Sequence, residues 1–209
     1  MPKELADLIL DLNEKEAVEL VQKKVKAGED PLKILDQVRT AMTMVGKKFE
    51  DKEFFLPDLI MSGEILRQIT EIIKPKLKDG AKVKSIGKIV LGTVAGDIHD
   101  IGKDIVKFML EANGFEVVDL GVDVPKEKFV EKIKETKTKI VALSGFLTLA
   151  YDSMKETINE IKKAGLRDKA KIIIGGGQMD ETIRKYVDAD AYGKDAMEAV
   201  AIAKKWVGV

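Results

Sequence analysis

The stretch KIVLGTVAGDIHDIG, residues 88–102, decides how the second half of the chain folds. Its first seven residues form an apolar run that predicts a buried strand, and a helical pattern begins at Ile101 after a polar turn. The same order recurs to the C-terminus, with strands predicted at residues 88–94, 116–120, 139–143, 171–174 and 189–191, and helices at residues 101–113, 126–135, 151–164, 179–186 and 195–206. This alternation predicts an α/β fold, a Rossmann-like domain with a parallel five-stranded sheet in the flavodoxin-like order 2-1-3-4-5.

The first half of the chain carries only helical patterns. Asn13 and Glu16 have the spacing of a capping box, and Asp30-Pro31 has the order of an N-cap followed by proline in the first helical turn. A short helix at residues 5–10 and a long one at residues 59–73 complete a small helical bundle. We expect two domains, a helical bundle at residues 1–80 and a Rossmann-like domain at residues 86–209, joined by a charged, glycine-containing linker at residues 76–87.

Composition excludes several classes of protein. Lys+Arg and Asp+Glu number 36 each, so the chain has no net basic field for nucleic acid or an anionic membrane. No apolar run approaches the ~20 residues of a membrane span, and the acidic N-terminal stretch is unlike a secretory signal. The absence of cysteine excludes disulfides and thiolate metal sites and is compatible with a reducing compartment. We therefore expect a cytoplasmic protein that binds neither nucleic acid nor membranes.

His99 is the only histidine in the chain, which also has no cysteine. A bare metal such as zinc needs about three or four protein ligands, which one imidazole cannot supply. A macrocycle that brings its own equatorial nitrogens needs only one axial ligand, so a tetrapyrrole-like cofactor with His99 as its metal ligand is the leading hypothesis. Asp97, two residues earlier, can accept a hydrogen bond from one ring nitrogen while the other nitrogen points away.

Polar or glycine-rich segments follow three of the predicted strands. They are Gly96-Asp97-Ile98-His99 after the first, Ser144-Gly145-Phe146-Leu147-Thr148 after the third and Gly175-Gly176-Gly177 after the fourth. Ligands of doubly wound sheets bind outside the carboxyl ends of the strands, so these segments converge on one edge. Plainer structural readings stay open: a surface or capping role for the histidine, helix capping for Asp97 and Asp100, and a tight turn at the three glycines.

The pattern Asp97-x-His99-x-x-Gly102, followed by Ser144 and by Gly175-Gly176, resembles the cobalamin-binding signature of corrinoid proteins. The helical half, with FFLP at residues 54–57, resembles the N-terminal bundle of small corrinoid proteins in methyltransferase systems. The resemblance covers nearly the whole chain. It implies a helical bundle joined to a cobalamin-binding Rossmann-like domain.

The resemblance also implies roles for individual residues. Cobalamin would bind base-off, with its benzimidazole tail displaced and His99 as the lower axial cobalt ligand. Asp97 would be the hydrogen-bond partner of His99, and Ser144 the next member of the relay. The residues expected to line the slot for the nucleotide tail or to contact the cofactor elsewhere are Asp100, Ile101, Gly102, Leu147, Thr148, Gly175, Gly176 and Gly177. One departure is visible: the family usually has Ser-x-Leu after the third strand, and Phe146 stands here in place of the leucine.

By resemblance, the protein carries a methyl group and does not turn over alone. Its expected partners are a substrate-specific methyltransferase, an acceptor methyltransferase directed to tetrahydrofolate or a thiol, and a reductive activator. The bundle would shield the methyl-bearing face of the corrin, with Phe54, Phe55, Leu56 and Met61 as candidates for that cap.

Other functions fit the sequence less well. A phosphoacceptor receiver domain needs an aspartate at the end of the third strand, where Ser144 stands. A nicotinamide enzyme needs Gly-x-Gly-x-x-Gly after the first strand, which residues 92–96 do not supply. Haem ligation by His99 has no second motif in its favour. A cobalamin-dependent sensor, which would add a basic DNA-reading segment, and a mutase-type cobalamin subunit stay as alternatives.

Overall fold

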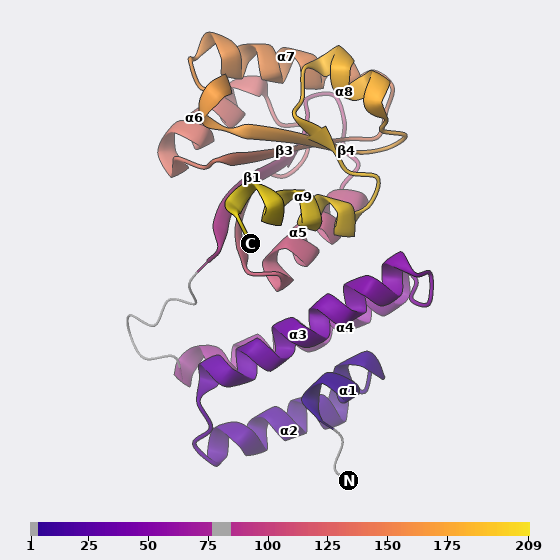
Figure 1. Ribbon diagram of the computed structural model, residues 1–209, viewed down its shortest axis with the longest axis vertical. Coiled ribbons are helices and arrows are strands. Elements are labelled where there is room, and N and C mark those ends of the chain that lie inside the picture. The colour runs from indigo at the N-terminus through magenta and orange to yellow at the C-terminus, as the bar shows by residue number, and fades with distance from the viewer. Residues whose placement is uncertain (1–3, 77–84) are drawn as a thin grey trace. The chain divides into compact units, whose positions relative to one another are not determined.

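The structure is a computed structural model that describes residues 4–76 and 85–209. It divides into two compact units: the first comprises residues up to 85 together with residues 112–114, and the second comprises residues 86–111 and 115–209. The first unit is helical, and the second contains the sheet with helices on both of its faces (Figure 1). Most of the predicted linker, at residues 77–84, lies outside the described residues. Within the described ranges, every helix is too short or too polar to cross a membrane.

Four α-helices form the described part of the helical unit: α1 (Leu5–Leu10), α2 (Glu14–Lys26), α3 (Pro31–Glu50) and α4 (Leu56–Ile73), followed by the short 3-10 helix η1 (Lys74–Lys76). The predicted start signals are confirmed. Asn13 Oδ1 accepts a hydrogen bond from Glu16 N at 3.3 Å, and Asp30 Oδ1 accepts one from Leu32 N at 2.9 Å. Helix α4 begins three residues earlier than predicted, with Pro57 in its first turn, where proline fits without losing a helical hydrogen bond.

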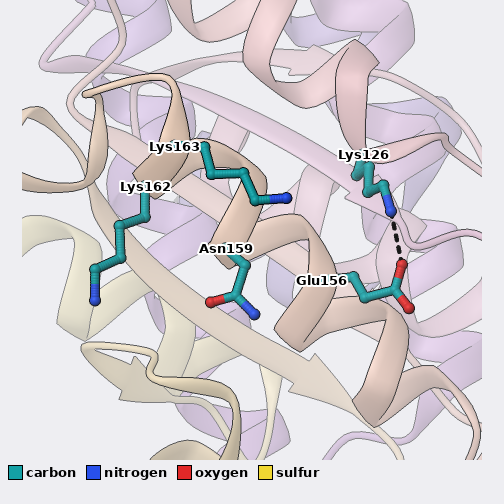
Figure 2. A pocket seen from close by; sticks show the side chains of 5 residues that line it. All are labelled: Lys126, Glu156, Asn159, Lys162 and Lys163. Carbon is teal, nitrogen blue, oxygen red and sulfur yellow. Dashed lines mark hydrogen bonds and ion pairs between the residues drawn. The ribbon is translucent and has the colours of Figure 1, made fainter.

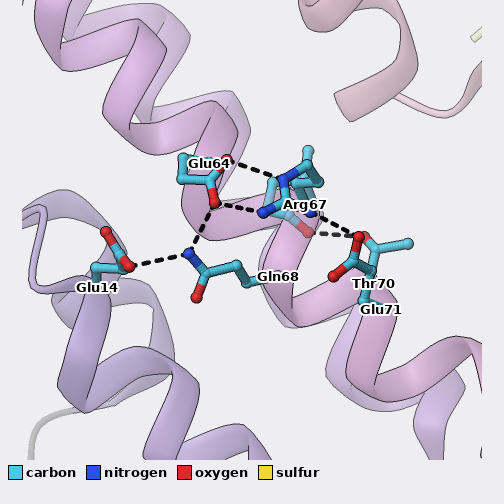
Figure 3. A network of polar contacts seen from close by, with 7 residues as sticks. Glu14, Glu64, Arg67, Gln68, Thr70 and Glu71 are labelled. Carbon is cyan, nitrogen blue, oxygen red and sulfur yellow. Dashed lines mark hydrogen bonds and ion pairs between the residues drawn. The ribbon is translucent and has the colours of Figure 1, made fainter.

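A chain of polar contacts links α2 to α4 on the surface of the helical unit (Figure 3). Gln68 Nε2 donates to Glu14 Oε1 at 2.9 Å and to Glu64 Oε1 at 2.8 Å. Arg67 bonds Glu64 on one side and Glu71 on the other. The hydrogen bonds from Arg67 and Gln68 lower the pKa of Glu64 to about 2. Exposed ion pairs contribute little to stability, so the buried apolar stripes of the helices, not this network, hold the unit together.

The second unit is a parallel sheet in the order β2-β1-β3-β4-β5. Its strands are β1 (Gly87–Thr93), β2 (Phe115–Asp119), β3 (Ile140–Gly145), β4 (Lys171–Gly176) and β5 (Ala191–Tyr192). Its helices are α5 (Ile101–Ala112), α6 (Lys126–Thr136), α7 (Ala150–Lys163), the 3-10 helix η2 (Arg167–Lys169), α8 (Glu181–Val187) and α9 (Ala196–Val207). Figure 1 shows α6, α7 and α8 on one face of the sheet and α5 and α9 on the other. The predicted fold class and strand order are confirmed.

Burial on both faces explains why the strands were readable as continuous apolar runs. Every residue of β3 is buried, as are the last five residues of β1. Gly114 and Gly165 directly follow the predicted helices at residues 101–113 and 151–164, and they adopt positive φ angles of 93° and 70°, which favour glycine. The fifth strand begins two residues later than predicted: it pairs with β4 at Ala191 and Tyr192, and Asp190 lies directly before it.

Asp190 ties β5 to the start of β4. Its carboxylate accepts hydrogen bonds from Arg167 Nη1, Lys171 Nζ and Ile172 N, each at 2.8 Å. Burial alone would raise the pKa of this carboxyl group, but the hydrogen bonds from Lys171 and Ile172 and the charge of Arg167 together lower it. Asp190 is therefore an anion at neutral pH.

We expect Asp190→Asn to lower the free energy of unfolding by about 1–3 kcal/mol at neutral pH, because charge-assisted hydrogen bonds are lost. A group whose pKa is lower in the folded state contributes stability above its unfolded pKa, and that contribution disappears as the pH falls through the folded pKa. In urea denaturation series, the difference between wild type and variant should therefore shrink as the pH falls below about 3.9, the ordinary pKa of an aspartate. Asp168→Asn, at an exposed carboxylate nearby, is the matched control and should change little. A difference independent of pH would contradict this account.

Candidate functional site

The loop after β1 places Asp97 and His99 at the carboxyl edge of the sheet, as predicted. Asp97 is fully buried and its carboxylate accepts four hydrogen bonds. Oδ1 accepts from the backbone N–H of His99 at 3.0 Å and lies 2.6 Å from Nδ1 of the same residue. Oδ2 accepts from the backbone N–H groups of Phe146 and Leu147, at 2.6 and 3.1 Å. One carboxylate thus joins the β1 loop to the β3 loop.

The protonation state of this pair follows from these contacts. Burial raises the pKa of Asp97, but the donated hydrogen bonds from the backbone of His99, Leu147 and Phe146 and from the His99 ring outweigh it and lower the pKa to about 2. A carboxylate can only accept, so the proton of a neutral imidazole lies on Nδ1 and the lone pair lies on Nε2. About half of the His99 side chain is exposed, at 49%. This donor set suits a cofactor that needs one axial nitrogen.

Ser144 does not take the predicted place in the relay. Within the described residues, its hydroxyl makes no hydrogen bond with the Asp97 carboxylate. Ser144 pairs with Thr93 in the sheet, two residues before the loop turns, and both acceptor positions of Asp97 Oδ2 are filled by the backbone of that loop. The prediction of a Ser144–Asp97 hydrogen bond is therefore wrong, although Ser144 stands at the predicted edge of the sheet.

Two further residues hold the histidine loop, and the sequence interpretation missed both. Asp123, after β2, accepts a hydrogen bond from Gly96 N through Oδ1 at 2.7 Å and donates its own N–H to Asp97 O at 2.9 Å. Thr93 Oγ1 donates to His99 O at 3.0 Å. Asp123 also has a positive φ of 51°, which aspartate tolerates better than most residues. In the sequence, only the predicted position of β2 beside β1 could have indicated that Asp123 contacts the histidine loop.

The remaining predicted residues gather along the same edge. Asp100, Ile101 and Gly102 form the start of α5, where Asp100 O accepts from Asp104 N at 2.8 Å. The Asp100 side chain makes no capping hydrogen bond within the described residues, so only its backbone fits the predicted cap. Leu147 and Thr148 are exposed after β3. The exposed apolar side chains of Ile98, Ile101, Phe146 and Leu149 give this edge a hydrophobic rim.

The three consecutive glycines at the end of β4, Gly175 to Gly177, differ in how closely their surroundings pack against them. A Cβ atom on Gly176 would lie 2.2 Å from Gly145 O, and one on Gly177 would lie 2.7 Å from Phe146 O, so the backbones of β3 and β4 meet here. Gly175 is freer, with Gly193 O at 3.7 Å as its nearest neighbour. Gly102 has no neighbour within 4 Å of its Cβ position. Packing therefore requires Gly176 and Gly177, whereas a Cβ atom would meet open space at Gly102 and an ordinary van der Waals contact at Gly175.

We expect Gly176→Ala to lower the free energy of unfolding of the sheet unit by about 2–3 kcal/mol, because the methyl group meets a backbone carbonyl and φ is unfavourable for alanine. The φ angle of Gly176 is 123°. Gly165→Ala is the matched control, since Gly165 also has a positive φ but has open space around its Cβ position. It should cost about 1 kcal/mol. Equal losses in urea denaturation would show that the clash with Gly145 O is unimportant.

A hollow elsewhere on the sheet unit is not a candidate for the cofactor site. It is lined by residues of α6 and α7, namely Lys126, Glu156, Asn159, Lys162 and Lys163 (Figure 2). Lys126 Nζ donates to Glu156 Oε2 at 2.8 Å, which leaves a lysine-rich lining without an imidazole. In the part of the chain that the structure describes, no three His, Cys, Asp or Glu residues gather into a bare-metal site.

Known proteins that resemble this chain bind a cofactor of the kind that the Asp97–His99 pair suits. Two families, each described as a B12 binding domain, match residues 87–201 and residues 2–74. Trimethylamine corrinoid protein 1 of Methanosarcina acetivorans is 40% identical over 197 residues, which are 93% of this chain and 91% of that protein.

Two solved structures are similar over most of this chain. A cobalamin-binding protein from Desulfitobacterium hafniense DCB-2 is 44% identical, with a TM-score of 0.78, over 97% of this chain and 96% of that one. One chain of the methanol:cobalamin methyltransferase complex MtaBC from Methanosarcina barkeri is 30% identical to this chain, with a TM-score of 0.86. The match covers 98% of this chain and 78% of that chain.

A helical unit and a doubly wound sheet, both matched by B12 binding domains, define the class of cobalamin-binding proteins. Within that class, the chain belongs to the family of corrinoid proteins of methyltransferase systems. Cobalamin is therefore its cofactor, and the resemblance drawn from the motifs is confirmed.

Proposed function

We propose that this protein carries a methyl group on a cobalamin bound at the carboxyl edge of the sheet. It would serve a substrate-specific methyltransferase and an acceptor methyltransferase, and it would require a reductive activator. Family membership supports this role, since relatives are named for trimethylamine and for a methanol:cobalamin methyltransferase complex. The cytoplasm is the proposed location.

The observation that carries the proposal is the pairing of Asp97 with His99. Cobalamin, when bound, supplies a cobalt centre that can accept a methyl group and release it. His99 is proposed to bind that cobalt from below through Nε2, with the benzimidazole tail displaced. Asp97 holds the proton on Nδ1, keeps the ring in one tautomer and raises the basicity of the free nitrogen. Because Asp97 is anchored by the β3 loop, the ligand is fixed to two strands of the sheet.

The nucleotide tail of the cofactor is proposed to run beside the glycines at the same edge. Support comes from the open space at Gly102, from the absence of any close contact at the Cβ position of Gly175 and from the exposed position of Thr148. Gly176 and Gly177 would shape this slot indirectly, by letting β3 and β4 approach each other. Asp100, Ile101 and Leu147 are proposed as further contacts along the rim.

The helical unit is proposed to act as a cap over the methyl-bearing face, so that residues 1–80 and 86–209 have separate roles. Its candidate cap residues lie at the start of α4, where Phe55 and Met61 are exposed at 65% and 42%. Ile60, which the sequence interpretation did not include, is exposed at 64% beside them. Phe54 is half-buried and lies under Lys48, whose Nζ is 5.3 Å from the ring centroid, so it is a weaker candidate.

Reconstitution tests the proposal. The purified chain is mixed with hydroxocobalamin, desalted and examined by visible absorbance and cobalt analysis. We expect one retained cobalamin per chain, with a spectrum typical of a displaced tail. The bound cobalamin is then reduced and afterwards methylated. Transfer of its methyl group to an acceptor methyltransferase would establish the carrier role. A colourless sample after desalting would contradict the proposal, as would a loaded protein that no methyltransferase can use.

A further inference from the structure

We propose that Phe146 is a positioning residue that orients the ring of His99, an inference that rests on the proposed ligation of cobalt by His99. The Phe146 and His99 ring centroids are 4.7 Å apart, and the ring planes are inclined at 33°. The backbone N–H of Phe146 also donates to Asp97 Oδ2 at 2.6 Å. One residue therefore contacts both members of the Asp97–His99 pair, the carboxylate through its backbone and the imidazole through its side chain.

The position of Phe146 is not explained by core packing. Its side chain is exposed at 58%, outside the buried cluster of the sheet unit. A single exposed aromatic side chain needs no special explanation, but the group that it contacts can reveal a specific role. Here the partner is the imidazole, at a distance and tilt within the range of favourable aromatic pairs.

A contact on the ring face matters for His99 because its hydrogen bond to Asp97 holds only one atom of the ring. The hydrogen bond from Nδ1 to Asp97 fixes that nitrogen, but the ring can still tilt about it, and half of the side chain is exposed. A second contact on the ring face restricts the tilt and so fixes the direction of the Nε2 lone pair. An axial ligand with a fixed direction loses less conformational freedom on binding than a mobile one.

The positioning role proposed for Phe146 belongs to this chain and is not a general feature of the cobalamin-binding signature. Leucine, the residue usual at this position in the resemblance, fills a similar space but has no ring to stack on the imidazole. Phe146→Leu therefore removes the aromatic contact while it keeps the backbone hydrogen bond to Asp97. Leu149→Ala is the matched control for the ring signals, because Leu149 is an apolar residue of the same loop, is exposed at 78% and carries no aromatic ring.

The first experiment uses the protein without cofactor, and so does not depend on cobalt ligation. With only one histidine in the chain, isotope-labelled histidine gives one set of ring signals in NMR spectra. We expect Phe146→Leu to shift the ring protons of His99, because the ring current of Phe146 is lost, and to broaden them as the ring tilts more freely. Leu149→Ala should leave them in place. Unchanged ring signals in Phe146→Leu would overturn the inference.

The second experiment measures retention of hydroxocobalamin by equilibrium dialysis. Phe146→Leu should bind about 2- to 10-fold more weakly than wild type, the fold-change that corresponds to loss of one aromatic pair. Ring signals that move without any change in affinity would overturn the positioning role. If wild-type protein binds cobalamin without a histidine nitrogen on cobalt, the proposed ligation fails, yet the NMR experiment still decides whether Phe146 orients the ring.

Discussion

His99→Ala is expected to weaken retention of cobalamin by at least about 100-fold, because losing a ligand should cost no less than losing its hydrogen-bond partner. The variant removes the only imidazole of the chain. Equilibrium dialysis with hydroxocobalamin, followed by visible absorbance of the retained fraction, measures the effect.

The control for His99→Ala is the fold of the variant. The side chain is half exposed, so the thermal midpoint of the cofactor-free protein should be nearly unchanged. An unaltered affinity in a well-folded variant would mean that cobalamin binds without this histidine, and the account of the site would be wrong. Loss of binding together with loss of folding would instead point to a structural role of the residue.

Asp97→Ala is expected to lower the free energy of unfolding by about 3–5 kcal/mol, because several backbone donors at a buried position lose their acceptor. These donors are the N–H groups of His99, Phe146 and Leu147. The variant should also bind cobalamin about 10- to 100-fold more weakly where it still folds, since the imidazole loses the partner that fixes its tautomer. Urea denaturation and equilibrium dialysis check the two effects separately.

Asp97→Asn and Asp100→Ala separate stability from ligation. Asparagine keeps one carbonyl acceptor, so it should cost less stability than alanine, but it carries no charge to raise the basicity of His99. Asp100 is exposed and makes no side-chain hydrogen bond within the described residues, so Asp100→Ala should change stability by less than about 0.5 kcal/mol. A stability loss in Asp100→Ala as large as that in Asp97→Ala would contradict the role given to the buried carboxylate.

Much of the fold could be predicted because its signals are local. Strands buried on both faces appear as apolar runs, and helix starts and stops appear as Asn13, Asp30, Gly114 and Gly165. The strand order then follows from general preferences of five-stranded doubly wound sheets. The weakest prediction was the fifth strand, which is only two residues long and whose place depends on the ion pairs of Asp190, a tertiary contact.

The site was predictable in outline but not in its contacts. Asp97 and His99 are two residues apart, so their pairing could be foreseen, and the structure has it at 2.6 Å. The partners of Asp97 Oδ2 are backbone N–H groups, which every residue except proline carries and which therefore leave no mark in a sequence. For that reason the sequence predicted a hydrogen bond from the Ser144 hydroxyl to Asp97, which the structure does not have. Asp123 lies far along the chain, and only the neighbouring positions of β1 and β2 bring it to the loop.

The central claim is that a nitrogen of His99 binds cobalt. The most direct test is electron paramagnetic resonance of the protein loaded with cobalamin in its cobalt(II) form, prepared once with ordinary histidine and once with histidine carrying the heavy nitrogen isotope. Because the chain has a single histidine, the label reports on that residue alone. The account predicts that each three-line nitrogen splitting becomes a two-line splitting on labelling. A spectrum that does not change with the label would contradict it.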